Sequence, residues 1–179
     1  MRVITGIARG KRLNSLSGND VRPTTDKVKE GIFSAIQFDI EGRRFLDMFA
    51  GSGQMGIEAL SRGAESAVFV DSSAEAIKVC TENVNFAGFL SNSKIIKRDS
   101  VSYVSTTSEN FDIVFLDPPY LTGILQTALN AVSFKVSDYG IIICEHPSND
   151  ILPEEVNGFS IYRVYHYGKI SVTIYKKVN

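Results

Sequence analysis

The stretch Asp117-Pro118-Pro119-Tyr120 carries the residue types in this chain that are best suited to chemistry. It directly follows an apolar run at 113–116, which predicts a buried strand. The two prolines stiffen the turn and cannot donate backbone hydrogen bonds. Asp117 supplies a carboxylate acceptor, and Tyr120 supplies a ring that can stack on a planar group. Together they predict a pocket for a planar ligand bearing an NH₂ group, which would donate to Asp117 and to the Pro118 carbonyl.

Acidic side chains also fall at or near the ends of predicted strands, at Asp47, Asp71, Asp99 and Asp117. Ligands of parallel sheets bind at these carboxyl ends. The turn at 51–56 fits G-x-G-x-x-G, and Asp71 follows Gly51 by twenty residues, so the pattern alone is compatible with a nicotinamide dinucleotide site. Asp47 argues against that site, because a carboxylate there suits a cationic amine better than a pyrophosphate.

Alternating strands and helices predict an α/β fold with a mostly parallel, seven-stranded sheet covered by helices on both faces. An antiparallel hairpin is expected at the C-terminus, and a β-hairpin at 2–13 followed by a helix at the N-terminus. The expected strands of the sheet cover 45–49, 67–70, 94–97, 111–116, 140–144, 159–165 and 170–175. His146 is expected in a loop after the fifth of these strands.

The N-terminal helix should bury one apolar face formed by Val28, Ile32 and Ile36, which recur every four residues. Lys27 and Lys29 are expected to point away from that face.

The chain has 179 residues and a formal net charge of −1, which suits a single domain. Residues 1–44 hold nine Lys/Arg and five Asp/Glu, and the remainder is acidic. A basic N-terminal extension (1–39) on a core (40–179) suits one-sided contact with a polyanion. No membrane span, signal peptide or metal-ligand spacing is found, and Cys80 and Cys144 lie in apolar patterns. We therefore expect a cytoplasmic protein without a metal or a membrane partner.

The segment Asp47-Met48-Phe49-Ala50-Gly51-Ser52-Gly53 resembles the first motif of Rossmann-like S-adenosylmethionine-dependent methyltransferases. Asp117-Pro118-Pro119-Tyr120 resembles the [Asp/Asn]-Pro-Pro-[Tyr/Phe] motif of enzymes that methylate exocyclic amino groups. The opening RVITGIARGKRL, followed by RPTTDKVKEGIFSAI, resembles the bacterial 16S ribosomal RNA guanine-N2 methyltransferase family, and the likeness covers essentially the whole chain. One departure is Lys29, where that family more often has arginine.

The resemblance implies S-adenosyl-L-methionine as cofactor and a guanine of small-subunit ribosomal RNA, in an assembled or partly assembled particle, as substrate. It implies catalytic roles for Asp117, Pro118, Pro119 and Tyr120. Asp47 would support the amino group of the cofactor, Asp71 its ribose diol and Asp99 its adenine amino group. The full set of implied cofactor-binding residues is Asp47, Phe49, Gly51, Gly53, Asp71, Ser72, Asp99 and Ser100. The basic residues expected to contact RNA are Arg2, Arg9, Lys11, Arg12, Arg22 and Lys27.

Other functions remain open at this level. A DNA adenine-N6 methyltransferase would use the same four-residue motif, but such enzymes usually carry an added recognition domain. A protein glutamine methyltransferase also acts on a planar amide, and the basic N-terminal segment argues against it. A non-catalytic cofactor-binding RNA module would not need Asp117 and Tyr120.

Overall fold

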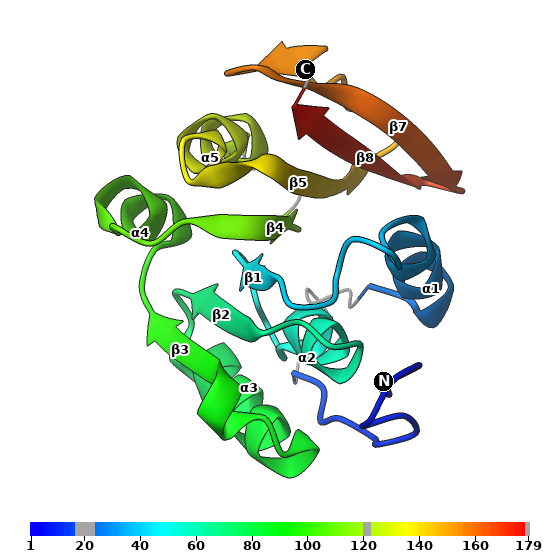
Figure 1. Ribbon diagram of the computed structural model, residues 1–179, viewed down its shortest axis with the longest axis vertical. Coiled ribbons are helices and arrows are strands. Elements are labelled where there is room, and N and C mark those ends of the chain that lie inside the picture. Colours follow the sequence, from blue (N-terminus) through cyan, green and yellow to red (C-terminus); the bar gives the residue numbers. More distant parts are fainter. Residues whose placement is uncertain (17–23, 120–122, 178–179) are drawn as a thin grey trace.

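The computed structural model describes residues 1–16, 24–119 and 123–177 (Figure 1). Within these ranges the helices are α1 (Asp26–Ala35), α2 (Gln54–Ser61), α3 (Ala74–Ala87), the 3-10 turn η1 (Leu90–Asn92), α4 (Ser100–Thr106) and α5 (Ile124–Ser133). The strands are β1 (Arg44–Asp47), β2 (Ser66–Asp71), β3 (Ser93–Lys97), β4 (Phe111–Leu116), β5 (Val136–Pro147), β6 (Glu155–Val156), β7 (Phe159–Tyr167) and β8 (Ile170–Lys177). The α/β class predicted from the sequence is confirmed.

The strands form one sheet in the order β3-β2-β1-β4-β5-β8-β7-β6. The first five of these strands run parallel to one another, whereas β8 runs antiparallel to β5 and to β7. After β1 the chain builds outward through β2 and β3, and it then returns to place β4 on the other side of β1. This reversal between β1 and β4 is the topological switch point, where open α/β sheets bind ligands.

Each face of the sheet is covered by helices, because apolar side chains alternate between the faces along the strands. Phe45 of β1 and Phe115 of β4 pack with α1, α2 and α3, while Leu46 and Val114 pack with α4 and α5 on the opposite face. Figure 1 shows these two helical layers on opposite sides of the sheet. The double covering explains why β4 is apolar nearly throughout.

The described sheet has eight strands rather than the seven predicted. The additional strand, β6, pairs only Glu155 with Ser160 and Val156 with Phe159. A two-residue strand is too short to show an alternating pattern. Strand β5 is also longer than predicted, and His146 lies inside it rather than in a loop. His146 is buried, and its Nε2 lies 2.8 Å from Thr173 Oγ1 of β8.

The predicted N-terminal hairpin is short and irregular: Arg2 and Arg12 form one antiparallel bridge, Val3 N donates to Lys11 O at 2.9 Å, and turns lie between the two arms. Part of the backbone instead bonds to α2, since Ile4 N and Thr5 N donate to the Glu58 carboxylate at 2.8 and 3.0 Å. Because the buried Glu58 side chain accepts the hydrogen bonds of these two amides, they need no partner in a second strand.

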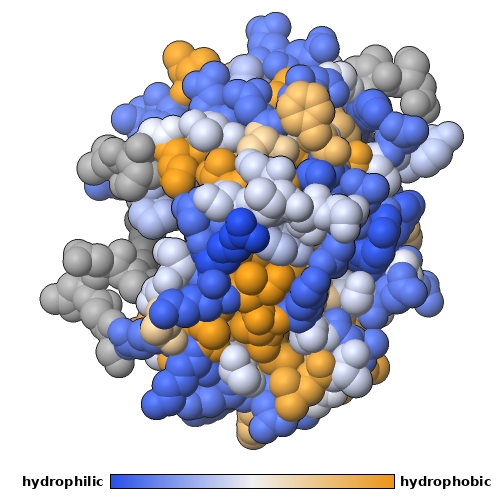
Figure 2. Space-filling view, turned by 90° about the vertical axis from the view of Figure 1, so that its left-hand side faces the viewer, coloured by the Kyte–Doolittle hydropathy of each residue, from blue (hydrophilic) through white to orange (hydrophobic). Residues whose placement is uncertain are grey.

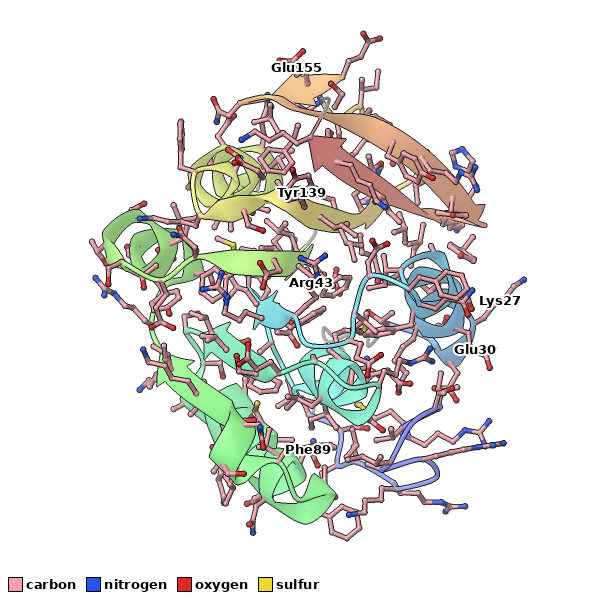
Figure 3. The ribbon with its side chains drawn as sticks, in the orientation of Figure 1. Lys27, Glu30, Arg43, Phe89, Tyr139 and Glu155 are labelled. Atoms are coloured by element: carbon pink, nitrogen blue, oxygen red, sulfur yellow. The ribbon has the colours of Figure 1, made fainter. Side chains whose placement is uncertain are left out.

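Helix α1 buries Val28, Ile32 and Ile36 as predicted. The prediction that Lys29 points away from this face is wrong, because its side chain is fully buried. Lys29 Nζ donates to Arg2 O at 2.6 Å and to Gln54 Oε1 at 3.2 Å, which compensates for the loss of water. Lys27 instead lies on the outer side of α1 (Figure 3).

Some large apolar side chains remain exposed, including Phe38, Phe134 and Ile151. The face drawn in Figure 2 carries apolar patches bordered by hydrophilic side chains. Apolar atoms form much of any protein surface, so this pattern alone assigns no function. Among the described residues, no helix is long and apolar enough to cross a membrane.

Candidate active site

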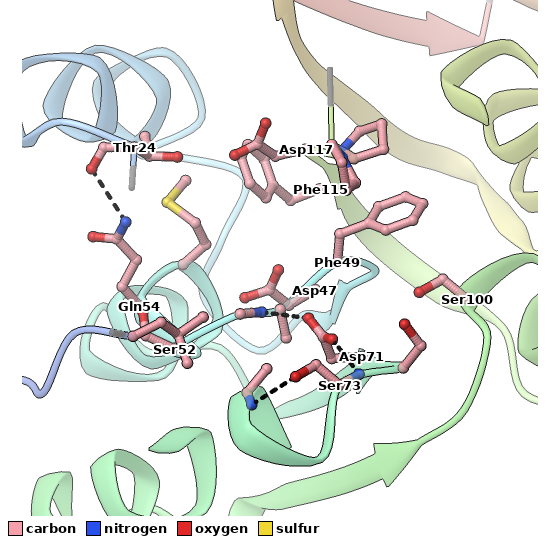
Figure 4. A pocket seen from close by; sticks show the side chains of 18 of the residues that line it. Thr24, Asp47, Phe49, Ser52, Gln54, Asp71, Ser73, Ser100, Phe115 and Asp117 are labelled. Atoms are coloured by element: carbon pink, nitrogen blue, oxygen red, sulfur yellow. Dashed lines mark hydrogen bonds between the residues drawn. The ribbon is translucent and has the colours of Figure 1, made fainter. Parts of the chain in front are cut away.

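A cavity of about 450 Å³ opens at the carboxyl ends of β1, β2 and β4, beside the switch point. Figure 4 shows side chains from several separate segments converging on it. All four predicted acidic residues line it, namely Asp47, Asp71, Asp99 and Asp117. Parallel strands bring these residues together because their carboxyl ends meet at one edge of the sheet.

Asp47 is the most deeply buried of these acids, with 1% of its surface exposed. Its Oδ2 accepts a hydrogen bond from Gly56 N of α2 at 3.1 Å. Burial raises the pKa of Asp47 to about 7, while the Gly56 bond opposes the rise. A cationic group entering the cavity would stabilise the ionised carboxylate, because opposite charges favour each other's charged forms.

The glycine turn after β1 is held by Asp71 at the end of β2. Asp71 Oδ2 accepts from Gly51 N at 2.9 Å, and Oδ1 accepts from Ser73 N at 2.8 Å. Gly51 (φ +52°) and Gly53 (φ +80°) adopt left-handed conformations that other residues rarely take. Asp71 therefore shapes the turn and also faces the cavity.

The two glycines have different surroundings. Gly51 lines the cavity, whereas Gly53 lies beneath the turn and outside the cavity lining. A Cβ at Gly53 would stand 2.7 Å from the sulfur of Cys80 in α3. The close packing of the turn on α3 is therefore enough to explain why glycine stands at position 53, without a direct contact to a ligand.

Asp99, which follows β3, and Ser100, the first residue of α4, both line the cavity. Asp99 caps α4 by accepting from Ser102 N at 2.8 Å, and this bond is the main cause that lowers the pKa of Asp99. The Ser100 hydroxyl donates to Met48 O, which ties α4 to the end of β1. Phe49 and Ser72 also line the cavity.

Asp117, Pro118 and Pro119 follow β4 and line the same cavity, while Tyr120 lies outside the described residues. Burial is the main cause that raises the pKa of Asp117 well above its usual value. The negative charges of Glu145 and Asp47 add to this, and the polar side chain of Thr24 opposes it. The ionisation of the Asp117 carboxyl group therefore depends on its burial and on its neighbours.

Sequence reasoning missed Thr24 and Gln54, which line the cavity. Thr24 directly precedes Thr25, whose side chain caps α1. Thr24 Oγ1 instead donates to Glu145 Oε2 of β5 at 2.8 Å. No local pattern indicates this contact, since the two residues are 121 positions apart.

The basic N-terminal residues lie on several surfaces. Arg2 forms an exposed ion pair with Asp26 at 3.3 Å, and Arg9 lines a second cavity of about 310 Å³ beside it. Lys11 Nζ donates to the carbonyls of Phe86 and Ala87, both at 3.1 Å. Arg12 and Lys27 are exposed, and Arg22 lies outside the described residues.

The switch-point cavity, the glycine turn and the acidic strand ends define a class of protein, the Rossmann-like S-adenosylmethionine-dependent methyltransferases. The residues present suit that cofactor, because carboxylates for hydroxyl and amino groups stand beside the apolar surfaces of Phe49 and Met55. Residues 1–176 match the model of the family described as Conserved hypothetical protein 95. The chain belongs to this family, and its curated relatives include bacterial small-subunit ribosomal RNA methyltransferases, as the sequence resemblance predicted.

Similar proteins support the assignment. A candidate rRNA methyltransferase from Bacillus subtilis, YlbH, is 38% identical over 99% of both chains. Ribosomal RNA small subunit methyltransferase D of Escherichia coli K12 is 29% identical, covering 99% of this chain and 90% of the relative. The solved structure of a methyltransferase candidate from Escherichia coli, yhhF, has a TM-score of 0.86 at 28% identity and covers 99% of this chain and 97% of that one.

Proposed function

We propose that this protein transfers a methyl group from S-adenosyl-L-methionine to the exocyclic N2 amino group of a guanine in small-subunit ribosomal RNA. The observation that carries the proposal is the position of Asp117 and Pro118 in one cavity with Asp47 and Asp71. That arrangement puts acceptors for an NH₂ group beside the acidic groups suited to the cofactor. The names of the relatives supply the substrate class.

In this proposal the cofactor lies along the ends of β1, β2 and β3. Asp47 supports its amino group, Asp71 accepts from its ribose hydroxyls and Asp99 accepts from its adenine amino group. The backbone of Gly51 approaches it closely, and Gly53 supports that turn from below. Phe49, Ser72 and Ser100 complete the binding surface.

The cofactor, when bound, supplies an electrophilic methyl group, and the protein must make the base nitrogen nucleophilic. The lone pair of an exocyclic amine is delocalised into the ring. Hydrogen bonds from its two N–H groups to the Asp117 carboxylate and the Pro118 carbonyl would draw the nitrogen toward tetrahedral geometry. An ionised Asp117 accepts such a bond more strongly than a neutral carboxyl group does, so the neighbours that control its ionisation matter for the rate. Positioning and preorganised charges provide the rate gain.

The substrate base must leave its stack to reach the cavity, which costs a few kcal/mol and less where it is unpaired. Tyr120 would stack on that base, and Pro119 would stiffen the turn. We propose that the whole chain acts as one methyltransferase domain (1–179), in which 1–39 is an RNA-contacting extension of the core (40–179). The substrate would be a partly or fully assembled small-subunit particle, because this small chain needs the folded RNA around the target for specificity.

The test compares methyl incorporation into small-subunit particles, naked ribosomal RNA and duplex DNA at matched salt, followed by nucleoside analysis. N2-methylguanine, formed best on particles, is expected. N6-methyladenine formed best on duplex DNA would replace the proposal with a DNA adenine methyltransferase, and methylation of protein alone would replace it with a glutamine methyltransferase.

The RNA surface has its own test. The double substitution Arg9→Glu and Arg12→Glu changes two exposed residues and leaves the buried Val3 and Leu13 in place. It should weaken RNA binding strongly and reduce its salt dependence, since phosphate contacts carry that affinity. Cofactor affinity should not change. An unchanged RNA affinity would remove these residues from the RNA surface.

A further inference from the structure

The C-terminal hairpin of β7 and β8 is a second basic part of the chain, besides the N-terminal segment. Residues 159–177 hold four Lys/Arg and no Asp/Glu, and they contain four of the seven tyrosines. Residues 45–158, by contrast, hold six Lys/Arg and fifteen Asp/Glu. The hairpin is therefore basic and rich in tyrosine, next to an acidic body. Cations together with aromatic rings are the combination that binds single-stranded nucleic acid.

Two side chains of β7 stand on the same face of the sheet as α1. Arg163 lies opposite Ile174 of β8, and Tyr165 lies opposite Val172. Residues directly opposite each other in an antiparallel pair project to the same face. Ile174 and Val172 belong to the buried apolar cluster that also contains the inner face of α1. Figure 1 shows β7 and β8 beside α1, toward the end of the sheet that carries β6.

Cations alternate with aromatic rings along this part of the hairpin. Lys176 Nζ lies 4.7 Å from the ring centroid of Tyr162. Arg163 Cζ lies 5.8 Å from the ring centroid of Tyr162 and 5.9 Å from that of Tyr165. Attraction between a cation and a ring face holds such side chains together on a surface. We call these four residues, Lys176, Tyr162, Arg163 and Tyr165, the hairpin row.

A purely structural role explains only part of the hairpin row. Charged side chains on an edge strand prevent pairing with other chains, and among the described residues β6 covers β7 only at Phe159 and Ser160. That role accounts for Arg163. It does not account for Tyr162, because an apolar ring on an open edge promotes such pairing. Packing in the core does not account for it either, since Tyr162 is 58% exposed.

The hairpin row extends from the edge of the sheet at which the active-site cavity opens. Tyr167 of β7 pairs with Ile170, and Ile170 pairs with Pro147 at the carboxyl end of β5. Since β5 is parallel to β4, this end lies at the same edge as the cavity. A strand rises about 3.3 Å per residue, so Tyr162 lies roughly 15 Å from Tyr167 along β7. The row is thus placed for nucleotides that flank a base in the cavity.

We propose that the hairpin row is a second RNA-contacting surface, which binds single-stranded nucleotides outside the target base. The rings of Tyr162 and Tyr165 stack on bases, and Arg163 contacts phosphate. The inference rests on the proposed function in one respect, namely that the ligand is RNA. RNA is favoured over a protein partner because a hairpin with four cations and no acid complements a polyanion.

Arg163 and Tyr162 are the residues on which the test depends. Lys176 forms an ion pair with Asp39 at 3.3 Å, so its replacement would also disturb the contact with the segment after α1. Arg163 is exposed and, within the described part of the chain, has no acid at ion-pairing distance. Both test residues can therefore be changed without removing a buried group.

The experiment measures binding of naked small-subunit ribosomal RNA in filter assays from low to moderate salt, without methyl transfer. Arg163→Glu should weaken binding at least about fivefold and reduce the slope of log affinity against log salt by about one, because a phosphate contact is lost. Tyr162→Ala should weaken binding about 5- to 100-fold with little change in this slope, because stacking does not release counterions. Tyr162→Phe retains the ring and should bind within about twofold of the natural sequence.

The matched control is Lys94→Glu, which changes the net charge by the same amount as Arg163→Glu. Lys94 is exposed on β3, at the opposite end of the sheet from the hairpin. It should leave RNA affinity within about twofold of the natural value. Calorimetry with S-adenosylhomocysteine should give the same affinity for every variant, which shows that the cofactor site remains folded.

RNA affinities of Arg163→Glu and Tyr162→Ala within about twofold of the natural value would overturn the inference, as would a natural sequence that binds no naked RNA. Weaker binding to protein-bound particles alone would assign the hairpin row to a ribosomal protein and would also overturn it. The proposed function fails separately. A natural sequence that binds RNA through the hairpin row but forms no N2-methylguanine supports the inference and refutes only the proposed reaction.

Discussion

Replacing Asp71 with alanine removes a carboxylate that has two structural bonds and a proposed contact with the cofactor. Its oxygens accept from Gly51 N at 2.9 Å and from Ser73 N at 2.8 Å. Hydrogen bonds to a charged group stabilise by about 1.5–3 kcal/mol each, and partial exposure places these two at the lower end. We therefore expect Asp71→Ala to lower the free energy of unfolding by about 2–4 kcal/mol.

Cofactor affinity should fall in addition, because the ribose hydroxyls would lose a charged acceptor. A loss of about 1–3 kcal/mol corresponds to a dissociation constant roughly 5- to 150-fold larger. The conservative substitution Asp71→Asn separates the two effects. Its single amide oxygen can still accept from one of Gly51 and Ser73, so about half of the stability loss should remain.

Urea denaturation measures the stability of both variants, and calorimetry with S-adenosylhomocysteine measures their affinity at a temperature where both are folded. The reasoning would be refuted in part by an Asp71→Ala protein that is destabilised but binds within about twofold of the natural sequence. Asp71 would then build the glycine turn without touching the cofactor. Unchanged stability would contradict the role of its two backbone bonds.

Three further predictions follow from the same cavity. Asp117→Asn should abolish methyl transfer in a tritiated-methyl assay yet retain S-adenosylhomocysteine binding in calorimetry; a rate near that of the natural sequence would exclude the proposed mechanism. Asp47 has a folded-state pKa of about 7, raised from its usual value, so its stabilising contribution is present in acid and is lost as pH rises toward 7. Asp47→Asn should therefore be more stable than the natural sequence at pH 8, by on the order of a few kcal/mol in urea denaturation. This difference in the free energy of unfolding should shrink toward pH 4. A difference that is the same at every pH would contradict the raised pKa of Asp47. Gly53→Ala should lower the free energy of unfolding by about 1–3 kcal/mol, through its positive φ and its approach to Cys80, and a variant as stable as the natural sequence would contradict this packing.

Features with a local cause were predicted well. The apolar face of α1 follows from the four-residue spacing of Val28, Ile32 and Ile36, and β4 was predicted over the residues that form it. The strand-end acids were expected to meet, because parallel strands align their carboxyl ends. All four line one cavity. Their individual roles toward a ligand, and the contribution of Tyr120, remain predictions.

Features that depend on distant partners were not predicted. A Cβ at Gly31 would stand 1.8 Å from the Tyr167 hydroxyl. Glycine at this position therefore leaves room for a side chain of β7, a strand distant in the sequence. The prediction for Lys29 was wrong for a related reason, because its polar partners come from the N-terminal segment and from α2.

The sequence by itself determined the α/β class, the family and the order of acidic residues along the sheet edge, because periodicity, glycine turns and motifs are properties of neighbouring residues. The tertiary structure alone decided that the Thr24 hydroxyl donates to Glu145, and that Gln54 joins the Thr24 carbonyl to the buried Lys29. These groups are polar, and a polar residue in a sequence is expected at the surface unless a partner meets it in the core. Which partners meet is set by the packing of α1 against the sheet, and no local pattern records that choice.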